Sequence, residues 1–475
     1  MSDVPAAIRD AYDPERLRAD GHRLVDALAD QLAAWQRREG VAVPWRPMDE
    51  ARAAWAGQGL AGGELVGDLM AAARASTALA NPRVMGHQVP PPLPSSALAE
   101  LVSALVNNGM AVAEMGPAAV PIEMVVIQWM CKTLGLPAGA GGVLTSGGSL
   151  GNLTALLAMR QAKAGWNVWR DGAHAGPPLA VIVGSDAHYS VARTVRIMGW
   201  GDAGVIPAQV DREHRMTAAA VEAALARAGD RRVIGLVAAA GSTATGAFDP
   251  LPELADLAAA RGLWLHVDAA HGGGLALSAA HRHRLAGIER ADSVVWDAHK
   301  LLMMPALVTA VLYKAEASSY EAFAQQASYL FAGTQPSDTW WDLGQRTLEC
   351  TKRAMSFELW AALRVHGEAW FGACVDRQIA LTATLARKLA AAGFEVPLAP
   401  TANIVCYRHR PPGLTGAALD AHNRMVRQRV VDDGTFYIVG TQLPGGYHLR
   451  STIMNPLIED RDLDELVAHL QALCR

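Results

Sequence analysis

Cysteine and lysine are both scarce in this chain of 475 residues. The five cysteines are odd in number, lie far apart and include no CxxC pair. That arrangement argues against a disulfide framework and against a cysteine-based zinc site. Lysine occurs only six times, at positions 132, 163, 300, 314, 352 and 388. A lysine in an unusual setting therefore stands out.

Several other features are missing, and each absence excludes a class of protein. Lys and Arg number 42 against 46 Asp and Glu, so no charge excess indicates a nucleic-acid or membrane-surface partner. The chain has no early apolar run of the kind found in signal peptides, and no stretch as long as a membrane span. No GxGxxG follows the first strand, which weakens a plain nucleotide-binding interpretation. We expect a reduced, cytoplasmic protein.

Hydrophobic periodicity divides the chain into three parts. Apolar residues at helical spacing predict an amphipathic helix over 13–39 and a second helix near 64–79. These helices form an N-terminal arm, residues 1–80, which has little core of its own and is expected to pack on a partner chain. Short apolar strands then alternate with helices, which predicts an α/β fold whose mostly parallel sheet is covered on both faces. The clearest strands are Leu179–Val183, Val233–Ala238, Leu263–Val267, Ser293–Trp296 and Val308–Tyr313.

We assign residues 81–350 to a large domain built on this sheet. Residues 351–475 form a smaller C-terminal α/β domain. Its predicted helices are 354–369, 371–392, 416–432 and a last one from 460, and its predicted strands are 403–407, 435–439 and 446–450.

Two neighbouring strands lead into reactive residues. One apolar strand ends in Asp268, and another leads into the run Asp297-Ala-His299-Lys300. Ligands of parallel sheets bind at the carboxyl ends of strands, so both groups can face one crevice. An aldehyde cofactor such as pyridoxal 5'-phosphate (PLP) needs a lysine amine for a Schiff base and an anion that keeps its ring nitrogen protonated. The alternative for Asp268 is a structural salt bridge, because a buried carboxylate needs a cation.

Three further segments fit such a cofactor, although each has an ordinary alternative. Gly147, Gly148 and Ser149 follow an apolar run and open a helix, where backbone amides and a hydroxyl can hold a phosphate. A plain strand–turn–helix connection explains them equally well. His188, just after strand 179–183, can stack on a planar ring or be a solvent-exposed histidine at a helix start. Ser242 or Thr243 can reach a ring oxygen or belong to an ordinary polar loop.

Taken together, these segments resemble the group II PLP-dependent decarboxylases, which include glutamate, cysteine-sulfinate, aromatic-amino-acid and diaminobutyrate decarboxylases. The resemblance runs from Asn81-Pro-Arg-Val-Met-Gly-His to Leu449-Arg-Ser-Thr-Ile-Met-Asn-Pro, which is most of the chain. It rests on ordered motifs at fitting spacings: Thr145-Ser-Gly-Gly-Ser, Ser185-Asp-Ala-His, Gly241-Ser-Thr, His266-Val-Asp-Ala-Ala and Trp296-Asp-Ala-His-Lys.

The resemblance implies a fold, a subunit arrangement and a role for each residue. The fold is that of the aspartate-aminotransferase-like PLP enzymes, fold type I. The family is homodimeric, with the arm swapped across the partner and the active site at the subunit interface. In the implied site Lys300 carries the Schiff base and Asp268 pairs with the pyridine nitrogen, while His188 stacks on one ring face and Ala270 on the other. The phosphate is held by Thr145, Ser146, Gly147, Gly148 and Ser149, with help from Asp297 and His299. Arg450 binds the substrate α-carboxylate.

The sequence departs from the family pattern in two places. Residues 327–331 resemble the start of the family's mobile loop, but no tyrosine lies between Ala332 and Trp341, where the family places its proton donor. His188, Tyr329 or water can supply the proton instead, or oxygen can intercept the reaction and give an aldehyde. In the pocket for the distal end of the substrate, the polar and bulky residues expected become His87, Gly109 and Ala111. A larger or aromatic substrate fits the added volume, while His87 equally suits an acidic tail.

These observations predict a carboxy-lyase whose small-molecule substrate is an amino acid: a PLP-dependent L-amino-acid α-decarboxylase. One alternative keeps PLP but forms an aldehyde with oxygen, as a decarboxylating oxidative deaminase or aldehyde synthase does. A second is a PLP-binding protein without turnover, against which the intact Lys300, Asp268 and His188 argue.

Overall fold

The computed structural model describes residues 4–323 and 340–475. The chain separates into two compact units. The first contains residues up to 87 together with 388–395 and 407–475, and the second contains 88–387 and 396–406. The three-part division expected from the sequence stays a prediction.

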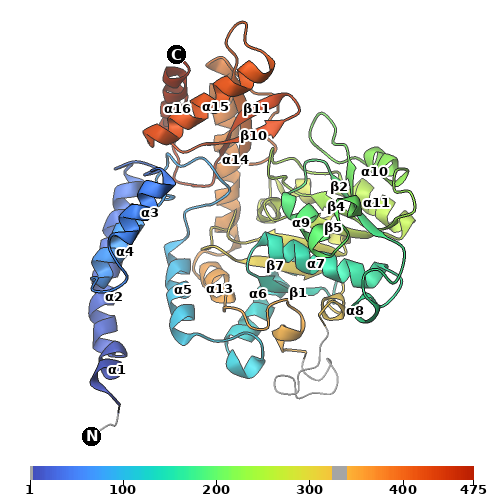
Figure 1. The fold of residues 1–475 in the computed structure, drawn as a ribbon, viewed down its shortest axis with the longest axis horizontal. Helices are drawn as coiled ribbons and strands as arrows, with labels where there is room; N and C mark the ends of the chain where they lie inside the picture. Colours follow the sequence, from blue (N-terminus) through green and yellow to red (C-terminus); the bar gives the residue numbers. More distant parts are fainter. Residues whose placement is uncertain (1–3, 324–339) are drawn as a thin grey trace. The chain divides into compact units, whose positions relative to one another are not determined.

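The second unit is built on a seven-stranded sheet (Figure 1). Only β7 is antiparallel to its neighbours, so the sheet is mostly parallel, as predicted. Every residue of β1, β2, β6 and β7 is buried, so both faces of these strands are covered. Across the sheet the strands are β1 (Gly141–Thr145), β7 (Thr309–Tyr313), β6 (Ser293–Asp297), β5 (Trp264–Asp268), β4 (Arg232–Ala239), β2 (Leu179–Gly184) and β3 (Val205–Ala208).

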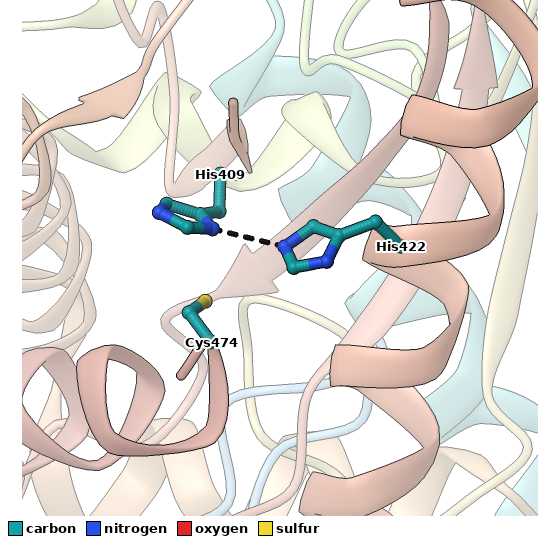
Figure 2. A group of neighbouring side chains, drawn as sticks. All are labelled: His409, His422 and Cys474. Carbon is teal, nitrogen blue, oxygen red and sulfur yellow. Dashed lines mark hydrogen bonds between the residues drawn. The ribbon is translucent and has the colours of Figure 1, made fainter. Parts of the chain in front are cut away.

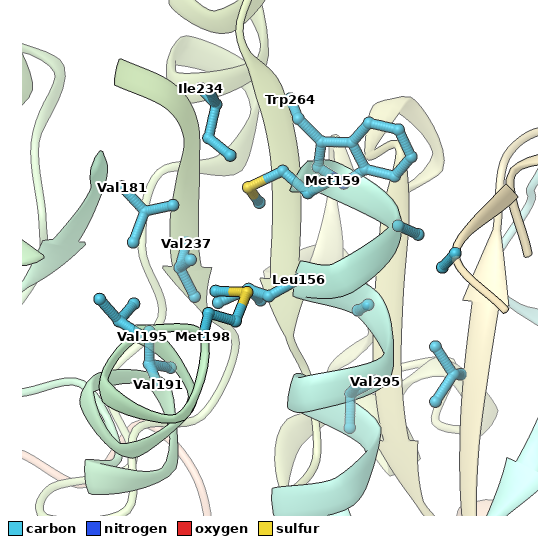
Figure 3. Packing of buried hydrophobic residues seen from close by; sticks show 14 of the residues in the cluster. Leu156, Met159, Val181, Val191, Val195, Met198, Ile234, Val237, Trp264 and Val295 are labelled. Carbon is cyan, nitrogen blue, oxygen red and sulfur yellow. The ribbon is translucent and has the colours of Figure 1, made fainter. Parts of the chain in front are cut away.

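A long helix, α7, packs across this sheet and forms its main core. Side chains alternate along a strand, so Val181, Val237 and Val295 all project into the same cluster. Figure 3 shows Leu156 and Met159 of α7 between these strands and helix α9. Both α7 side chains are fully buried. This packing fixes the start of α7 relative to the ends of the strands.

The remaining helices of this unit connect the strands or flank the sheet. Helices α10 and α11 pack against strands β2 to β5 and against each other. The bounds are α5 (Pro94–Val106), α6 (Ala119–Thr133), α7 (Gly148–Lys163), α8 (Val168–Asp171), α9 (Tyr189–Ile197), α10 (Ala218–Leu225), α11 (Leu251–Arg261), α12 (Ser318–Glu321), α13 (Ser356–His366) and α14 (Glu368–Ala391), the last of which ends in the first unit.

The first unit combines the N-terminal helices with most of a four-stranded sheet, in which β9 (Ile404–His409) begins in the second unit. Helix α2 carries none of its 23 residues buried, although its apolar residues follow helical spacing. Helices α15 and α16 pack against each other, and α15 also packs on β11. The helices are α1 (Ala6–Ala11), α2 (Pro14–Gln36), α3 (Met48–Ala56), α4 (Leu65–Arg74), α15 (Gly416–Asp433) and α16 (Asp460–Leu473), and the sheet order is β10 (Val439–Leu443), β11 (Gly446–Thr452), β9 (Ile404–His409) and β8 (Phe394–Glu395).

One predicted strand was wrong. The apolar run 435–439 forms only the beginning of β10, which starts at Val439. Tyr437 instead pairs with the segment around Val84, where it accepts a hydrogen bond from the Met85 amide and donates one to the Arg83 carbonyl. The residues around Tyr437 therefore pair with a short segment from a distant part of the chain instead of extending β10. None of the described helices is long and apolar enough to cross a membrane.

Candidate active site

A cavity of about 160 Å³ opens at the carboxyl ends of the parallel strands in the second unit. Asp268 is the last residue of β5 and Asp297 the last residue of β6, while α7 begins just after β1. Ten of the candidate cofactor-binding residues named from the sequence line this cavity. The lining consists of Gly148, Ser149, Asn152, His188, Ala239, Gly241, Ser242, Thr243, Asp268, Ala270, His271, Asp297, His299 and Lys300.

The amine of Lys300 lies 2.9 Å from Oδ2 of Asp297. The Asp297 side chain is 2% exposed, and its other oxygen accepts a hydrogen bond of 2.6 Å from the Thr309 hydroxyl. Asp297 and Thr309 are register partners in the antiparallel pair β6–β7, which explains this contact. Nε2 of His299 lies 3.5 Å from Oδ2 of the same carboxylate. A buried, oriented carboxylate therefore positions the lysine amine at the mouth of the cavity.

The Asp268 carboxylate is held by two donors. Oδ2 accepts a 3.0 Å hydrogen bond from Nδ2 of Asn152, and Oδ1 accepts a 3.1 Å bond from the Ala270 amide. Asn152 lies on α7, one helical turn after Gly148. Two hydrogen bonds fix the plane of the carboxylate while it still lines the cavity.

A chain of buried groups fixes the orientation of the Asn152 amide. Its oxygen lies 2.9 Å from Nε2 of His266, whose Nδ1 lies 2.8 Å from the Ser293 hydroxyl. That hydroxyl in turn accepts a hydrogen bond from the Trp264 indole. Complete burial lowers the pKa of His266 to about 4, so the imidazole is neutral at pH 7. The pattern assigns its proton to Nε2, which donates to Asn152 and leaves the amide nitrogen facing Asp268.

The same amide also orients His188. Nδ2 of Asn152 donates to the Ser190 hydroxyl at 2.9 Å, and this hydroxyl lies 2.8 Å from Nδ1 of His188. The Ser190 amide donates to the same ring nitrogen at 3.3 Å. Burial is the largest cause that lowers the pKa of His188, although the negative charge of Asp268 opposes it. A neutral His188 that accepts at Nδ1 carries its proton on Nε2.

The start of α7 forms the phosphate end of the cavity. Gly147 has a φ of 103°, which glycine adopts without strain, and the 16-residue helix begins at Gly148. A Cβ on Gly148 would lie 3.1 Å from Oδ2 of Asp297, so glycine allows that close approach. Gly148 and Ser149 line the cavity, whereas Ser146 turns away and its hydroxyl donates to Glu349 at 2.9 Å. Gly147 forms the turn before the helix and does not itself line the cavity.

Comparison with known proteins identifies the family. Residues 88–410 match the model of the pyridoxal-dependent decarboxylase conserved domain. The chain belongs to this family. It is therefore a PLP-dependent carboxy-lyase, with the fold type I architecture that the resemblance implied.

Named relatives of this decarboxylase cover most of its length. Cysteine sulfinic acid decarboxylase of Mus musculus is 32% identical over 394 residues, which cover 80% of this chain and 79% of the relative. L-2,4-diaminobutyrate decarboxylase of Acinetobacter baumannii is 30% identical over 407 residues, with 82% and 80% covered. The crystal structure of mouse CSAD superposes with a TM-score of 0.90 at 26% identity and covers 98% of this chain and 99% of that one.

The residues of this decarboxylase fit PLP. The cavity combines an amine, a carboxylate held by two hydrogen bonds, and a helix N-terminus at its far end. These are the groups that an aldehyde, a pyridine nitrogen and a phosphate require. Ala270 is buried beside Asp268 and also lines the cavity, as does Thr243.

None of the four residues expected to bind substrate is among those that line this cavity. Gly109 and Ala111 pack on the segment 343–352: a Cβ on Gly109 would lie 2.8 Å from Oγ1 of Thr351, and the Ala111 carbonyl accepts a hydrogen bond from Gly344. Neither lines the cavity. His87 and Arg450 belong to the first unit. There, desolvation lowers the pKa of His87, and the positive charge of Arg450 lowers it further.

The segment expected to correspond to the family's mobile loop, at about residues 325–342, lies mostly outside the described residues. Sequence reasoning missed Asn152, which carries no signal beyond its place one turn after the glycine turn of α7. It also missed the support that Ser190, His266 and Thr309 provide. Each of these residues supports another side chain of the site, and no sequence motif indicates that role.

Proposed function

We propose that this enzyme is an L-amino-acid α-decarboxylase that attaches PLP through Lys300 and releases carbon dioxide and an amine. The observation that carries the proposal is the convergence of the Lys300 amine, the Asp268 carboxylate and the His188 imidazole on one cavity. When bound there, PLP withdraws electrons from the substrate α-carbon and so weakens the bond to its carboxyl group. The curated relatives above are decarboxylases by name, which supports an amine product over an aldehyde.

Residues of the chain orient the reacting groups and supply the proton. Asp297 orients the Lys300 amine, and Asp268 provides the anion for a protonated ring nitrogen. His188 holds its transferable proton on Nε2, because Ser190 occupies Nδ1. A neutral imidazole with one oriented N–H is a suitable proton donor to the carbon that has lost carbon dioxide. This role replaces the loop tyrosine that the sequence lacks.

For substrate binding we propose Arg450 as the partner of the α-carboxylate. It lies on β11, its side chain is 5% exposed, and a guanidinium offers two parallel donors in a fixed plane. His87, Gly109 and Ala111 would then shape the space for the rest of the substrate. The named relatives act on cysteine sulfinate and 2,4-diaminobutyrate, and both compounds belong in any substrate panel.

We also propose that the enzyme is a homodimer, with the arm of one subunit on its partner and the active site at the interface. One face of α5 carries Leu98, Leu101, Val102, Leu105 and Val106, each 48–58% exposed. That spacing forms a single helical stripe, which a monomer would leave in water. The absence of buried residues in α2 supports the same conclusion. A cytoplasmic location remains part of the proposal, in agreement with five cysteines that form no disulfide.

The reaction is tested with a panel of L-amino acids assayed for carbon dioxide, amine, aldehyde and peroxide together. The panel contains acidic, basic and aromatic side chains, with the D-enantiomer of each active compound as the matched control. Equal amounts of carbon dioxide and amine, with no oxygen dependence, are expected. Aldehyde and peroxide as main products would replace the proposal by the oxidative one, and no carbon dioxide from any member would refute turnover.

Covalent attachment is tested by borohydride reduction of the enzyme as purified, followed by peptide mass spectrometry. The cofactor adduct is expected on Lys300 and should be absent from Lys300→Ala. Lys163→Ala and Lys314→Ala serve as controls and should keep both adduct and activity. An adduct on either of those two lysines would move the site. The dimer is tested by light scattering of Leu101→Glu/Leu105→Glu, which should become monomeric, against Ile197→Glu, an exposed aliphatic change on α9 that should not.

A further inference from the structure

Three metal-binding side chains meet in the first unit, in a part of the chain that the site above does not use. His409 is the last residue of β9, His422 lies on α15, and Cys474 directly follows α16. Figure 2 shows the two imidazoles and the thiol gathered around one point. One donor atom from each residue lies within 4.8 Å of the other two, and all three side chains are half-buried. The group is thus open to an ion from solvent.

The spacing of these atoms is close to that of a tetrahedral zinc site. Nδ1 of His409 and Nε2 of His422 lie 2.9 Å apart. Zinc–nitrogen bonds of about 2.0–2.1 Å and zinc–sulfur bonds of about 2.3 Å place two nitrogens about 3.3 Å apart and a nitrogen and a sulfur about 3.6 Å apart. The imidazoles need to separate by a few tenths of an ångström, and the thiol needs only to approach. Ordinary side-chain rotation supplies both movements.

The backbone around the group is already held in place. Asn423, the neighbour of His422, accepts a hydrogen bond from the His409 amide at 2.9 Å and donates one to the His409 carbonyl at 2.9 Å. These two hydrogen bonds connect α15 to β9 next to both imidazoles. Arg429 of α15 donates to the Leu473 carbonyl at 2.8 Å, directly before Cys474. The three donors therefore come from rigid elements, which lowers the entropy that an ion must overcome on binding.

Binding of a cation would change the positions of the protons in this group. The contact between the two ring nitrogens requires one of them to lack a proton, since each must act as donor or acceptor. A bound ion takes the place of this hydrogen-bonding proton, which moves to the other nitrogen of the donor imidazole, and it is held by both facing ring nitrogens. It also displaces the thiol proton to solvent, and the resulting thiolate offsets part of the repulsion from the Arg429 guanidinium.

We propose that His409, His422 and Cys474 bind one zinc ion, with water as the fourth ligand. Two imidazoles and one thiolate are a ligand set that zinc accepts, and the partial exposure of all three leaves the fourth position open. The ion would join β9, α15 and the C-terminal end of α16. The sequence argued against a cysteine-based zinc site because it lacks CxxC, but here each ligand comes from a different element.

The test uses the full-length enzyme with its cofactor, treated with a chelator and then titrated with Zn²⁺. Elemental analysis after gel filtration should find one zinc per chain. Co²⁺ in place of zinc should give the visible bands of a tetrahedral thiolate site, at longer wavelengths than PLP absorbs. His409→Gln, His422→Gln and Cys474→Ser should each weaken binding by about tenfold or more. Cys350→Ser, which removes an exposed cysteine outside the group, should bind like the parent.

A second measurement does not depend on these variants. Zinc should slow the alkylation of Cys474 by iodoacetamide by about tenfold or more, as followed by peptide mass spectrometry. Cys350 in the same sample is the internal control and should react at the same rate with and without zinc. Unchanged labelling of Cys474, or zinc binding that survives all three ligand substitutions, would overturn the proposal.

Discussion

The amide nitrogen of Asn152 donates a hydrogen bond of 3.0 Å to the carboxylate of Asp268, 116 residues further along the chain. The same nitrogen donates to Ser190, which contacts His188. One helical side chain thus sets the positions of both the anion and the imidazole that line the cavity. Within the described part of the chain, Asn152 forms hydrogen bonds with Asp268, Ser190 and His266 and none with Lys300 or Asp297. It therefore acts as a positioning residue.

Asn152→Ala should reduce kcat while Lys300 still carries the cofactor. The substitution frees Asp268 and leaves the buried Nε2–H of His266 without its acceptor, which costs about 1–3 kcal/mol in the free energy of unfolding. We expect a loss of about tenfold or more in kcat, together with a changed pH profile because His188 loses its support. Asn167→Ala, an exposed substitution at the start of α8, is the control and should leave the pH profile unchanged. A profile identical to that of the parent in Asn152→Ala would contradict the positioning role.

Asp268→Asn should lower the rate by about 10²-fold or more, since it removes the anion from the ring-nitrogen position. The amide keeps the shape of the side chain, so the borohydride adduct on Lys300 should persist. The measurement combines steady-state kinetics with the adduct yield. Near-normal turnover would show that the ring does not lie against this carboxylate.

Arg450→Lys should raise KM by about tenfold with little loss of bound cofactor, because a planar fork becomes a point charge. Substrate kinetics and cofactor content are measured on the same preparation. Arg427→Lys, a change in a nearby positive charge that we do not assign to the substrate, is the matched control. If Arg450→Lys lost cofactor but kept KM, Arg450 would leave the substrate role.

Glu358→Gln should make the stability of the protein less dependent on pH. Burial is the main cause that raises the pKa of Glu358 from 4.5 to about 8, and the negative charge of Glu100 adds to it. Because the folded state binds this proton more tightly than the unfolded state, its stabilising effect is full below pH 4.5 and is lost as pH rises through 8. At pH 9 the free energy of unfolding of the variant should exceed that of the parent by an amount on the order of a few kcal/mol. Near pH 4 this difference should disappear.

Thermal or urea unfolding at both pH values checks this difference. Glu15→Gln on α2, an exposed glutamate, is the control and should behave like the parent at both. A variant that is less stable than the parent at pH 9 would show that the Glu358 carboxylate is favourable when ionised.

Most strands of the large sheet were predictable because each is a local pattern. A continuous apolar run of five or six residues with both faces buried is visible without knowledge of its neighbours. The missed strand β3 lies at the sheet edge, contains Pro207 and alternates between buried and exposed residues, so it has no such run. The run 435–439 had the pattern of a strand, but its pairing partner near Val84 lies far away in the sequence. Pairing over such a distance leaves no mark on local periodicity.

The strand ends, and the reactive groups that follow them, could be predicted from local runs of residues alone. Asp268 and Lys300 were identified because each lies at or just after the end of an apolar strand. The change from apolar to polar residues is visible between adjacent positions of the sequence. The residues that surround those groups became apparent only from the folded arrangement. The packing of helix α7 on the sheet brings Asn152 to Asp268, and strand register brings Thr309 to Asp297. The meeting of His409, His422 and Cys474 has the same origin. Such contacts depend on how helices and strands pack, and packing is a property of the whole core rather than of any one segment.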